Sequence, residues 1–269
     1  MSSRIFREER LQLIYEQIRE NGKVYVSNLA QEFGVSASSI RLDLGKLEAR
    51  GLITRTYGGA MLPVEVNGDV IEDISELSLR AERRRAEKEA IGKLTATFIE
   101  DGDTIMIDGG STTKSVAKHL TDKRNLTVIT NSISLLPDLL GIKDAVVYLV
   151  GGLVYRENAV LVGDIANEIV EYFHPLKVVL GIDGISVSSG LTAADTSVPA
   201  VASIKRKMID VSDQLIVVAD HTKLGRVCLM PVAPLKRVDC LVTDSGASAE
   251  MVEAIRANGP TVEIAEVET

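Results

Sequence analysis

The sequence predicts an α/β protein, in which a small N-terminal helical module precedes a larger domain built around a mainly parallel β-sheet with helices on both faces. Two patterns favour this fold class. Residues 1–61 contain short helical periods that glycines separate, whereas short apolar runs alternate with amphipathic segments from residue 104 onward. Strands that are apolar along their whole length and alternate with helices are typical of a parallel sheet covered on both sides.

Length and charge favour two domains of different character. The 269 residues suffice for one large domain or two modest ones, and a composition of 45% hydrophobic and 25% charged residues is ordinary for a globular protein. The net charge is −8, yet residues 1–61 carry nine Lys/Arg against seven Asp/Glu, while the rest carries twenty-one against thirty-one. We therefore expect a local basic module on an acidic body rather than nucleic-acid binding over the whole surface.

The spacing of cysteine and histidine indicates neither a metal site nor a disulfide scaffold. Cys228 and Cys240 stand in no CxxC pattern, and the three histidines show no ligand spacing. The N-terminus has no apolar signal segment, and no run approaches the roughly 18 apolar residues of a membrane-spanning helix. We expect a cytoplasmic protein that needs no cofactor or metal and has no membrane partner.

Residues 1–61 are predicted to form a winged helix-turn-helix. An amphipathic helix over Arg7–Glu20 precedes an extended segment, and Ser27 is placed to cap a second, short helix that a glycine ends. A third helix starts at a Ser36 cap, and residues 52–60 then predict a short strand and wing. Two short helices joined by a turn that contains glycine form the helix-turn-helix pattern.

The start of the third helix carries the residues that we expect to contact DNA. Its small, hydrogen-bonding side chains suit close approach to a major groove, and the basic residues that follow suit phosphates. The alternative is a small helical docking module whose serine only caps the helix. The candidate DNA contacts are Ser36, Ser38, Ser39, Arg41, Lys46, Arg50, Arg55 and Tyr57.

Residues 62–78 are predicted to be a linker, since they are acidic, lack periodicity and contain turn-forming proline, asparagine and glycine. The larger domain is expected over residues 79–269. It begins with a charged helix in which Arg83 to Arg85 are interleaved with glutamates. This pattern favours a solvent-exposed face with internal ion pairs over a second nucleic-acid patch.

The larger domain is predicted from six apolar runs and five helical segments that largely alternate. The predicted strands are Thr104–Ile107, Leu126–Thr130, Val146–Val150, Val178–Gly181, Leu215–Ala219 and Cys240–Thr243. The predicted helices between or after them are Lys114–Leu120, Ser134–Leu139, Ile165–Tyr172, Ala200–Val211 and Ala249–Ala257.

Polar residues follow five of these strands, and the carboxyl ends of parallel strands are where such sheets bind ligands. Hydroxyl and backbone N–H groups suit a phosphate, a lysine supplies the opposite charge, and Asp and Asn side chains suit sugar hydroxyls. For the first loop alone, a turn whose Ser and Thr cap the next helix is the alternative. The candidate effector contacts are Asp108, Gly110, Ser111, Thr112, Thr113, Thr130, Asn131, Ser132, Gly151, Gly152, Gly181, Asp183, Asp220 and Lys223.

The segment from Val35 to Ala60, VSASSIRLDLGKLEARGLITRTYGGA, resembles the signature of the DeoR family of bacterial transcriptional regulators. The family pattern runs roughly VSxxTIRRDLxxLExxGxxxRxHGGA. Ser39 stands for the usual threonine, Leu42 for a usual arginine and Tyr57 for the usual histidine. The resemblance implies a DNA-reading third helix, with one phosphate contact in doubt at Leu42.

The larger domain resembles the effector domain of the same family, which is similar in fold to ribose-5-phosphate isomerase and glucosamine-6-phosphate deaminase. The matching motifs are Asp108–Thr113, Thr130–Ser132 and Asp220–Lys223. The resemblance implies a repressor of a sugar-catabolic operon that a phosphorylated sugar releases. One departure is Val198-Pro199-Ala200, where the family usually has an acidic residue.

The function expected from the sequence is therefore a DNA-binding transcriptional regulator rather than an enzyme. Because one helix-turn-helix reads only a half-site, a homodimer or homotetramer on double-stranded operator DNA is expected. The competing hypothesis is an isomerase-like or deaminase-like enzyme with an appended DNA-binding arm. Asp183 is a candidate for a vestigial general base, because of the isomerase-like fold that the resemblance implies. A third hypothesis is an interaction scaffold whose pocket is empty.

Overall fold

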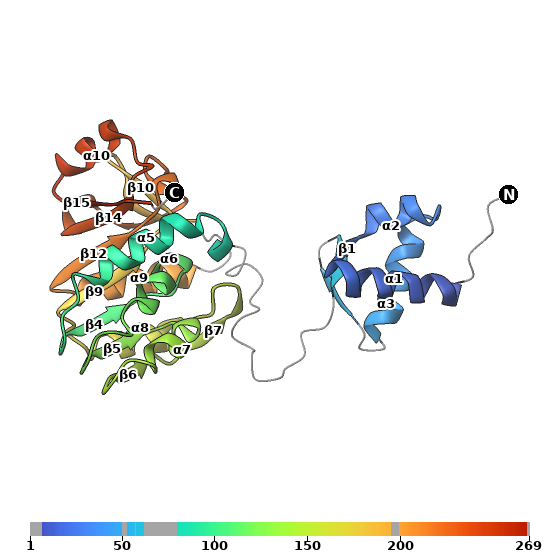
Figure 1. Cartoon of the computed structure of the whole chain (residues 1–269), viewed down its shortest axis with the longest axis horizontal. Helices are drawn as coiled ribbons and strands as arrows, with labels where there is room; N and C mark the ends of the chain where they lie inside the picture. Colours follow the sequence, from blue (N-terminus) through green and yellow to red (C-terminus); the bar gives the residue numbers. More distant parts are fainter. Residues whose placement is uncertain (1–6, 50–52, 57, 62–79, 195–198, 268–269) are drawn as a thin grey trace. The chain divides into compact units, whose positions relative to one another are not determined.

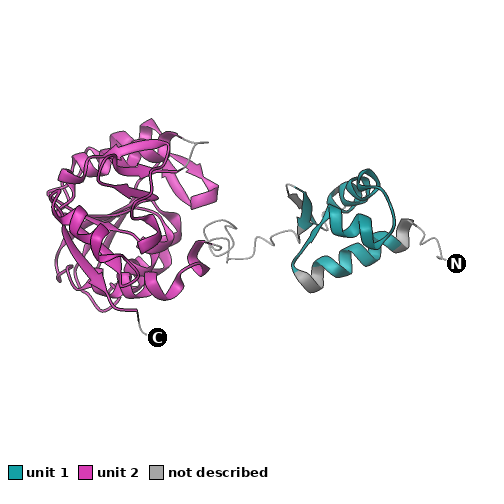
Figure 2. Cartoon of the chain, turned by 90° about the horizontal axis from the view of Figure 1, so that it is seen from above, with its two compact units in different colours: residues 1–70 teal, residues 71–269 magenta. Residues whose placement is uncertain are grey.

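The computed structural model describes residues 7–49, 53–56, 58–61, 80–194 and 199–267. The chain divides into two compact units, residues 1–70 and residues 71–269, which Figure 2 shows in different colours. The predicted linker, residues 62–78, lies outside the described residues. Across the part of the chain that is described, no helix is long and apolar enough to cross a membrane.

The first unit is a winged helix-turn-helix, as the sequence predicts. Its three strands form an antiparallel sheet in the order β1-β3-β2, and the β2–β3 hairpin is the wing. Its elements are α1 (Arg7–Asn21), β1 (Lys23–Tyr25), α2 (Val26–Glu32), α3 (Ala37–Ala49), β2 (Thr54–Thr56) and β3 (Gly59–Met61).

Two serines were predicted as helix caps, and the structure bears out one of them. The Ser36 hydroxyl accepts a hydrogen bond from the backbone N–H of Ser39 at 3.2 Å, which satisfies a donor at the start of α3. The prediction for Ser27 is wrong, because α2 already begins at Val26 with Tyr25 as its N-cap. Ser27 instead donates to the side chain of Asn28 at 3.1 Å.

A buried ion pair fixes α3 against α1. The guanidinium of Arg10 lies 2.7 Å from the Asp43 carboxylate, which is fully buried. Around this pair, apolar residues of all three helices form one core, including Ile14, Leu29 and Leu44. The inward face of α3 is therefore fully occupied, and its opposite face is left for a partner.

The second unit is built on a seven-stranded parallel sheet in the order β15-β14-β12-β9-β4-β5-β6. Figure 1 shows the strands in this order, from β15 at the top to β6 at the bottom. The strands of this sheet are β4 (Thr104–Ile107), β5 (Thr127–Thr130), β6 (Val146–Leu149), β9 (Lys177–Gly181), β12 (Gln214–Val218), β14 (Cys240–Asp244) and β15 (Thr261–Ala265).

Helices cover both faces of the sheet, because successive strand residues are apolar on both sides. Ile105 and Ile107 face one core, and Met106 between them faces the other. The first core contains α5 (Arg85–Ala96), α6 (Ser111–Lys118) and α7 (Leu136–Leu139), and the second contains α8 (Asp164–Val170), α9 (Pro199–Asp210) and α10 (Ala249–Arg256). The predicted fold class is thus confirmed.

The sequence did not predict β15 or two smaller antiparallel elements. One is a sheet in the order β10-β11-β13, and the other is the β7–β8 hairpin. Their strands are β7 (Leu153–Tyr155), β8 (Val160–Val162), β10 (Gly184–Ser186), β11 (Gly190–Ala193) and β13 (Met230–Ala233).

The strand order places a topological switch point between β4 and β9. From β4 the chain proceeds to β5 and β6 on one side, and from β9 it proceeds to β12, β14 and β15 on the other. The loops that leave β4 and β9 therefore diverge at the carboxyl edge and leave a crevice there. Open α/β sheets bind their ligands in such a crevice.

Candidate functional site

A pocket of about 1100 Å³ opens at the carboxyl edge of the parallel sheet in the second unit. It lies at the switch point, since residues after β4, β9 and β12 all line it. Nine of the predicted effector contacts meet there: Asp108, Gly110, Ser111, Thr112, Asn131, Gly181, Asp183, Asp220 and Lys223.

The other five predicted contacts lie outside the pocket lining. Thr113 and Thr130 bond backbone carbonyls, with Thr113 Oγ1 donating to Gly110 at 3.0 Å and Thr130 Oγ1 donating to Ile107 at 2.7 Å. Ser132 is fully buried and lies 3.0 Å from the hydroxyl of Ser134. Gly151 and Gly152 lie between β6 and β7. The hydroxyls of Thr113, Thr130 and Ser132 therefore form hydrogen bonds within the loops and do not face the cavity.

Asn131 joins the two loops on the β4 side of the pocket. Its side-chain oxygen accepts from the backbone N–H of Gly109 at 3.2 Å, and its amide donates to the Leu161 carbonyl at 3.4 Å. Gly109 must be glycine, because a Cβ there would lie 2.2 Å from Val160 Cγ1. The tight approach presses the loop after β4 against the loop after β5 and fixes the start of α6.

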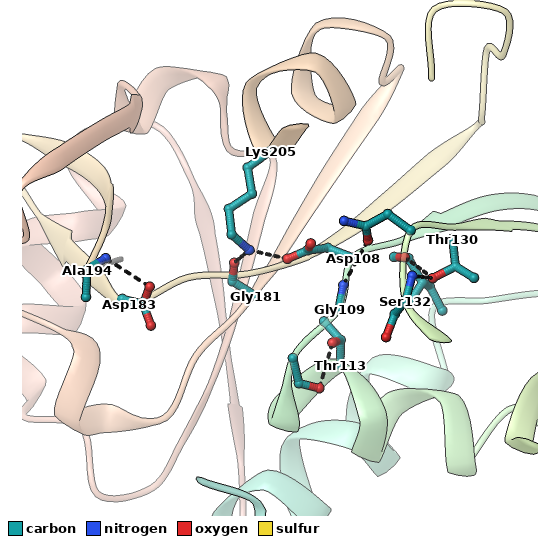
Figure 3. Close-up of polar contacts among 12 residues, drawn as sticks. Asp108, Gly109, Thr113, Thr130, Ser132, Gly181, Asp183, Ala194 and Lys205 are labelled. Atoms are coloured by element: carbon teal, nitrogen blue, oxygen red, sulfur yellow. Dashed lines mark hydrogen bonds and ion pairs between the residues drawn. The ribbon is translucent and has the colours of Figure 1, made fainter. Parts of the chain in front are cut away.

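A buried ion pair lies at the centre of the pocket. The ammonium of Lys205 on α9 bonds the Asp108 carboxylate and also donates to the Gly181 carbonyl at 2.9 Å (Figure 3). Burial raises the pKa of Asp108 above its usual range, although the adjacent Lys205 charge opposes that rise. The pair ties β4, β9 and α9 together across the switch point.

Lys205 was not among the predicted site residues, because the prediction followed only the carboxyl ends of strands. A signal exists in the sequence. Lys205 lies one position after Ile204 and three before Met208, on the face of α9 that is buried. A lysine on the apolar face of an amphipathic helix needs a buried partner, which the Asp108 carboxylate supplies.

Asp183 faces the same pocket from the loop after β9. One carboxylate oxygen accepts from the backbone N–H of Ala194 at 3.0 Å, and the other lies 3.9 Å from the Arg80 guanidinium. The Asp183 carboxylate is thus held by a structural hydrogen bond and an ion pair. Val198, where the family pattern departs, lies outside the described residues.

The pocket is more basic than the sequence prediction indicated. Eight Lys or Arg side chains line it against four Asp or Glu side chains. The ion pairs predicted for Arg83 to Arg85 exist in part, since Arg84 pairs with Glu87 and Arg85 with Glu82. All three arginines nevertheless line the pocket, as do Arg80 and Arg226.

A local bend brings these arginines to the pocket. Arg84 adopts the left-handed conformation with φ of 58°, directly before α5. The Lys88 ammonium, on the first turn of α5, donates to the carbonyls of Arg80 and Arg83, the latter at 2.6 Å. Lys88 is only 5% exposed, so its hydrogen bonds stabilise the bend from the buried side of the segment.

Stability of the chain should rise with pH through the range in which Lys88 titrates. Burial lowers the pKa of Lys88 from 10.5 to about 8, although Asp220 opposes the shift. Between these values the unfolded chain binds more protons than the folded one, so rising pH favours the folded state. Urea unfolding at a series of pH values would measure this increase.

The Lys88→Met variant should lose this part of the pH dependence. Lys93→Met, an exposed change on the same helix, is the matched control and should keep it. An unchanged increase in Lys88→Met would mean that another group causes it.

The loop after β12 is held by two carboxylates, its own Asp220 and Asp244 at the end of β14. The Asp220 side chain accepts from the backbone N–H of Thr222 at 3.0 Å and caps the 3-10 turn η3 (His221–Lys223). His221 is turned away from the pocket lining, because its Nδ1 lies 2.7 Å from the buried Asp244 carboxylate. Lys223 is half-buried and lines the pocket.

The predicted DNA-contacting residues of α3 lie on its open face. Ser36, Ser38, Arg41 and Lys46 are exposed and Ser39 is half-buried, opposite the core residues of the same helix. Leu42 lies on this face too and is 64% exposed. Arg55 lies in β2, where its backbone pairs with Ala60, while Arg50 and Tyr57 lie outside the described residues.

Sequence comparison agrees with both units. The family model described as the DeoR C-terminal sensor domain matches residues 83–245, and the model described as the DeoR-like helix-turn-helix domain matches residues 10–66. The transcriptional repressor AccR of Agrobacterium fabrum is 36% identical over 239 residues, covering 89% of this chain and 90% of that protein. The HTH-type transcriptional repressor GlcR of Bacillus subtilis is 35% identical over 256 residues, covering 95% of each.

A further relative is the glycerol-3-phosphate regulon repressor of Escherichia coli, which is 29% identical over 242 residues and covered to 92%. Among solved structures, a probable sor operon regulator from Shigella flexneri has a TM-score of 0.45 at 11% identity, covering 63% of this chain and 89% of that one. A D-ribose-5-phosphate isomerase has a TM-score of 0.37 at 16% identity, covering 51% and 52%. Neither structural likeness bears on function.

The two matched models together span both units of the chain, and the relatives cover it almost from end to end. The chain therefore belongs to the DeoR family of DNA-binding transcriptional regulators.

Proposed function

We propose that this chain is a transcriptional repressor whose affinity for operator DNA falls when a phosphorylated sugar binds in the pocket of the second unit. The observation that carries the proposal is the basic pocket at the switch point, in a chain that also has a winged helix-turn-helix. The relatives named as repressors support the same direction of regulation.

The pocket has the groups that a sugar phosphate needs. The first residues of α6, Gly110 to Thr112, line it, and no side chain caps the Gly110 end of that helix. Free backbone N–H groups at a helix start favour an anion. Asp220 offers a carboxylate for sugar hydroxyls, and Lys223 supplies a positive charge.

The enzyme hypothesis receives less support. The relatives are named as repressors, and both oxygens of the Asp183 carboxylate have partners, one the backbone N–H of Ala194 and the other the Arg80 guanidinium at 3.9 Å. A general base needs a free oxygen within hydrogen-bond reach of the substrate proton. We propose a regulator without catalytic turnover, and release of product from any phosphosugar incubated with the chain would contradict this.

On the DNA side, we propose that α3 enters the major groove through the face that carries Ser38, Arg41 and Lys46. A dimer or tetramer is part of the proposal, because each helix-turn-helix reads one half-site. Binding to DNA selected from a random library, followed against chain concentration, would give the number of chains on each operator. One chain on each operator at saturation would contradict the proposed assembly.

The salt dependence of operator binding tests which side chains contact phosphates. Replacing Arg41 by alanine should reduce the slope of log affinity against log salt by about one for each chain bound. Leu42→Arg adds a charge to the same exposed face and should increase the slope by about the same amount. Arg124→Gln, an exposed change in the second unit, is the control and should leave the slope unchanged.

A slope that Arg41→Ala leaves unaltered would remove Arg41 from the phosphate contacts. A slope near zero for the unmodified chain would contradict the proposed DNA binding as a whole.

A further inference from the structure

We propose that the effector carries two phosphoryl groups, which bind on opposite sides of β9. The loop after β4 would hold one group, and Arg83, Lys223 and Arg226 would hold the other. This inference rests on the proposed function of the pocket and specifies the class of ligand.

The first argument is the distribution of charge in the pocket. Of its eight basic side chains, Lys205 pairs with Asp108, Arg84 with Glu87 and Arg85 with Glu82. Arg80 lies near Asp183, and Lys88 donates to backbone carbonyls. The remaining three, Arg83, Lys223 and Arg226, form no ion pair within the described part of the chain.

Arg83 and Arg226 are exposed and Lys223 is half-buried, and three positive charges beside one pocket attract an anion. The charge of Lys223 also reaches Lys88, whose pKa burial lowers most and Lys223 lowers further. One phosphate monoester carries about −1.5 to −2 charges near neutral pH. A monoester at the start of α6 would leave three positive charges, those of Arg83, Lys223 and Arg226, which the carboxylate of Asp220 offsets only in part.

The second argument is the spacing of the two groups. The loop after β4 supplies Gly110, Ser111 and Thr112, whereas Lys223 and Arg226 follow β12. In the sheet β12 and β4 both pair with β9, one on each side. Neighbouring strands lie about 4.8 Å apart, so the two loops leave the sheet roughly 10 Å apart. Phosphoryl groups at the two ends of a pentose or hexose are separated by a distance of this order.

The third argument is the size of the cavity. Pockets for small molecules usually measure about 300–1,000 Å³. At about 1100 Å³ this pocket lies just above that range, so its volume does not restrict the ligand to a sugar with a single phosphate. Gly181, the last residue of β9, lines the pocket between the two loops.

Inorganic phosphate is the first probe, since its binding does not depend on which sugar the chain recognises. Equilibrium dialysis of the full chain should show that the double variant Arg83→Gln/Arg226→Gln binds one phosphate ion fewer than the unmodified chain. The control Arg124→Gln removes an exposed arginine before β5, at the opposite edge of the sheet, and should bind the same number as the unmodified chain. An equal number bound by the double variant would overturn the second phosphate site.

Fructose 1,6-bisphosphate and its two monophosphates then test whether one molecule occupies both sites. Calorimetry should show the bisphosphate binding at least about tenfold more tightly than either monophosphate, and the double variant should lose this advantage. Equal affinity for all three in the unmodified chain would overturn the inference that one ligand bridges the loops. Operator binding without ligand should be unaltered in the double variant, which shows that it folds.

The inference and the proposed function fail in different ways. If a monophosphate alone releases operator DNA and the phosphate count is one, the chain is still a phosphosugar-responsive repressor and only the second site is lost. If no phosphorylated sugar releases the DNA, the proposed function is contradicted whatever the phosphate count.

Discussion

Replacing Lys205 by methionine is expected to lower the free energy of unfolding by about 3–5 kcal/mol, because the Asp108 carboxylate would stay buried without its partner. The two side chains are 7% and 2% exposed, so water cannot replace the lost interaction. Methionine fills most of the lysine volume, which separates the loss of charge from the loss of packing. Urea unfolding of the full chain measures the difference.

The loss should depend on pH in a defined direction. Burial already raises the pKa of Asp108, and removing the Lys205 charge should raise it further. When folding raises the pKa of a carboxyl, the folded chain holds the proton more tightly than the unfolded chain does. The stability of the folded state is then greatest at low pH and falls as pH rises from the pKa of the unfolded chain through that of the folded chain. Lys205→Met should therefore be closer to the unmodified chain at pH 5 than at pH 8.

The double variant Asp108→Asn/Lys205→Met is the matched control. Removing both charges should recover most of the lost stability, since replacing a whole buried pair is often close to neutral. A single variant that costs less than about 1 kcal/mol would mean that Asp108 gains little from this lysine. A double variant as unstable as the single one would show that packing, not charge, is the cause.

The same pair shows what sequence patterns reveal and what they leave hidden. The apolar runs of β4 and β9 predict the sheet, and the polar residues at their ends predict where a ligand binds. Asp108 was predicted as a ligand contact in this way. Lys205 was not, because it comes from a helix 97 positions away in the chain and meets Asp108 only when α9 packs across the switch point.

The arginines before α5 illustrate a second limit. Local spacing correctly predicted ion pairs with neighbouring glutamates, and two of these are present. Local spacing does not reveal the left-handed residue Arg84 or the buried Lys88, which together turn the segment toward the pocket. No residue spacing in the sequence marks a lysine that donates hydrogen bonds to backbone carbonyls at a bend.

The small antiparallel elements escaped prediction for a related reason. β10 and β11 are only three and four residues long, and every residue in them is buried. Runs this short give no periodic pattern that can be read from the sequence, and their glycine and serine residues are also common in turns. Gly190, with φ of +67° and no room for a side chain beside the Ala233 carbonyl, was a turn signal that could have been used.

Replacing Lys223 by methionine is expected to raise the effector concentration that releases operator DNA by about 10–100-fold, which corresponds to the roughly 1.5–3 kcal/mol of a charged hydrogen bond. Lys223 lines the pocket, and the hydrogen bond from Thr222 N–H to Asp220 fixes the turn that carries it. Because the turn positions the lysine in advance, little entropy is lost when the ligand binds. Operator binding in increasing amounts of phosphosugar gives the release midpoint.

Lys236→Met makes the same exchange at an exposed position outside the pocket, and its midpoint should match that of the unmodified chain. Operator affinity without effector should stay unchanged in both variants, because neither residue belongs to the first unit.

The ratio between operator affinity without effector and operator affinity at saturating effector should also stay unchanged in Lys223→Met, if the lysine only binds the ligand. A ratio that falls toward one would show instead that Lys223 distinguishes the two states of the chain, since a ligand shifts an equilibrium only through its differential affinity for them.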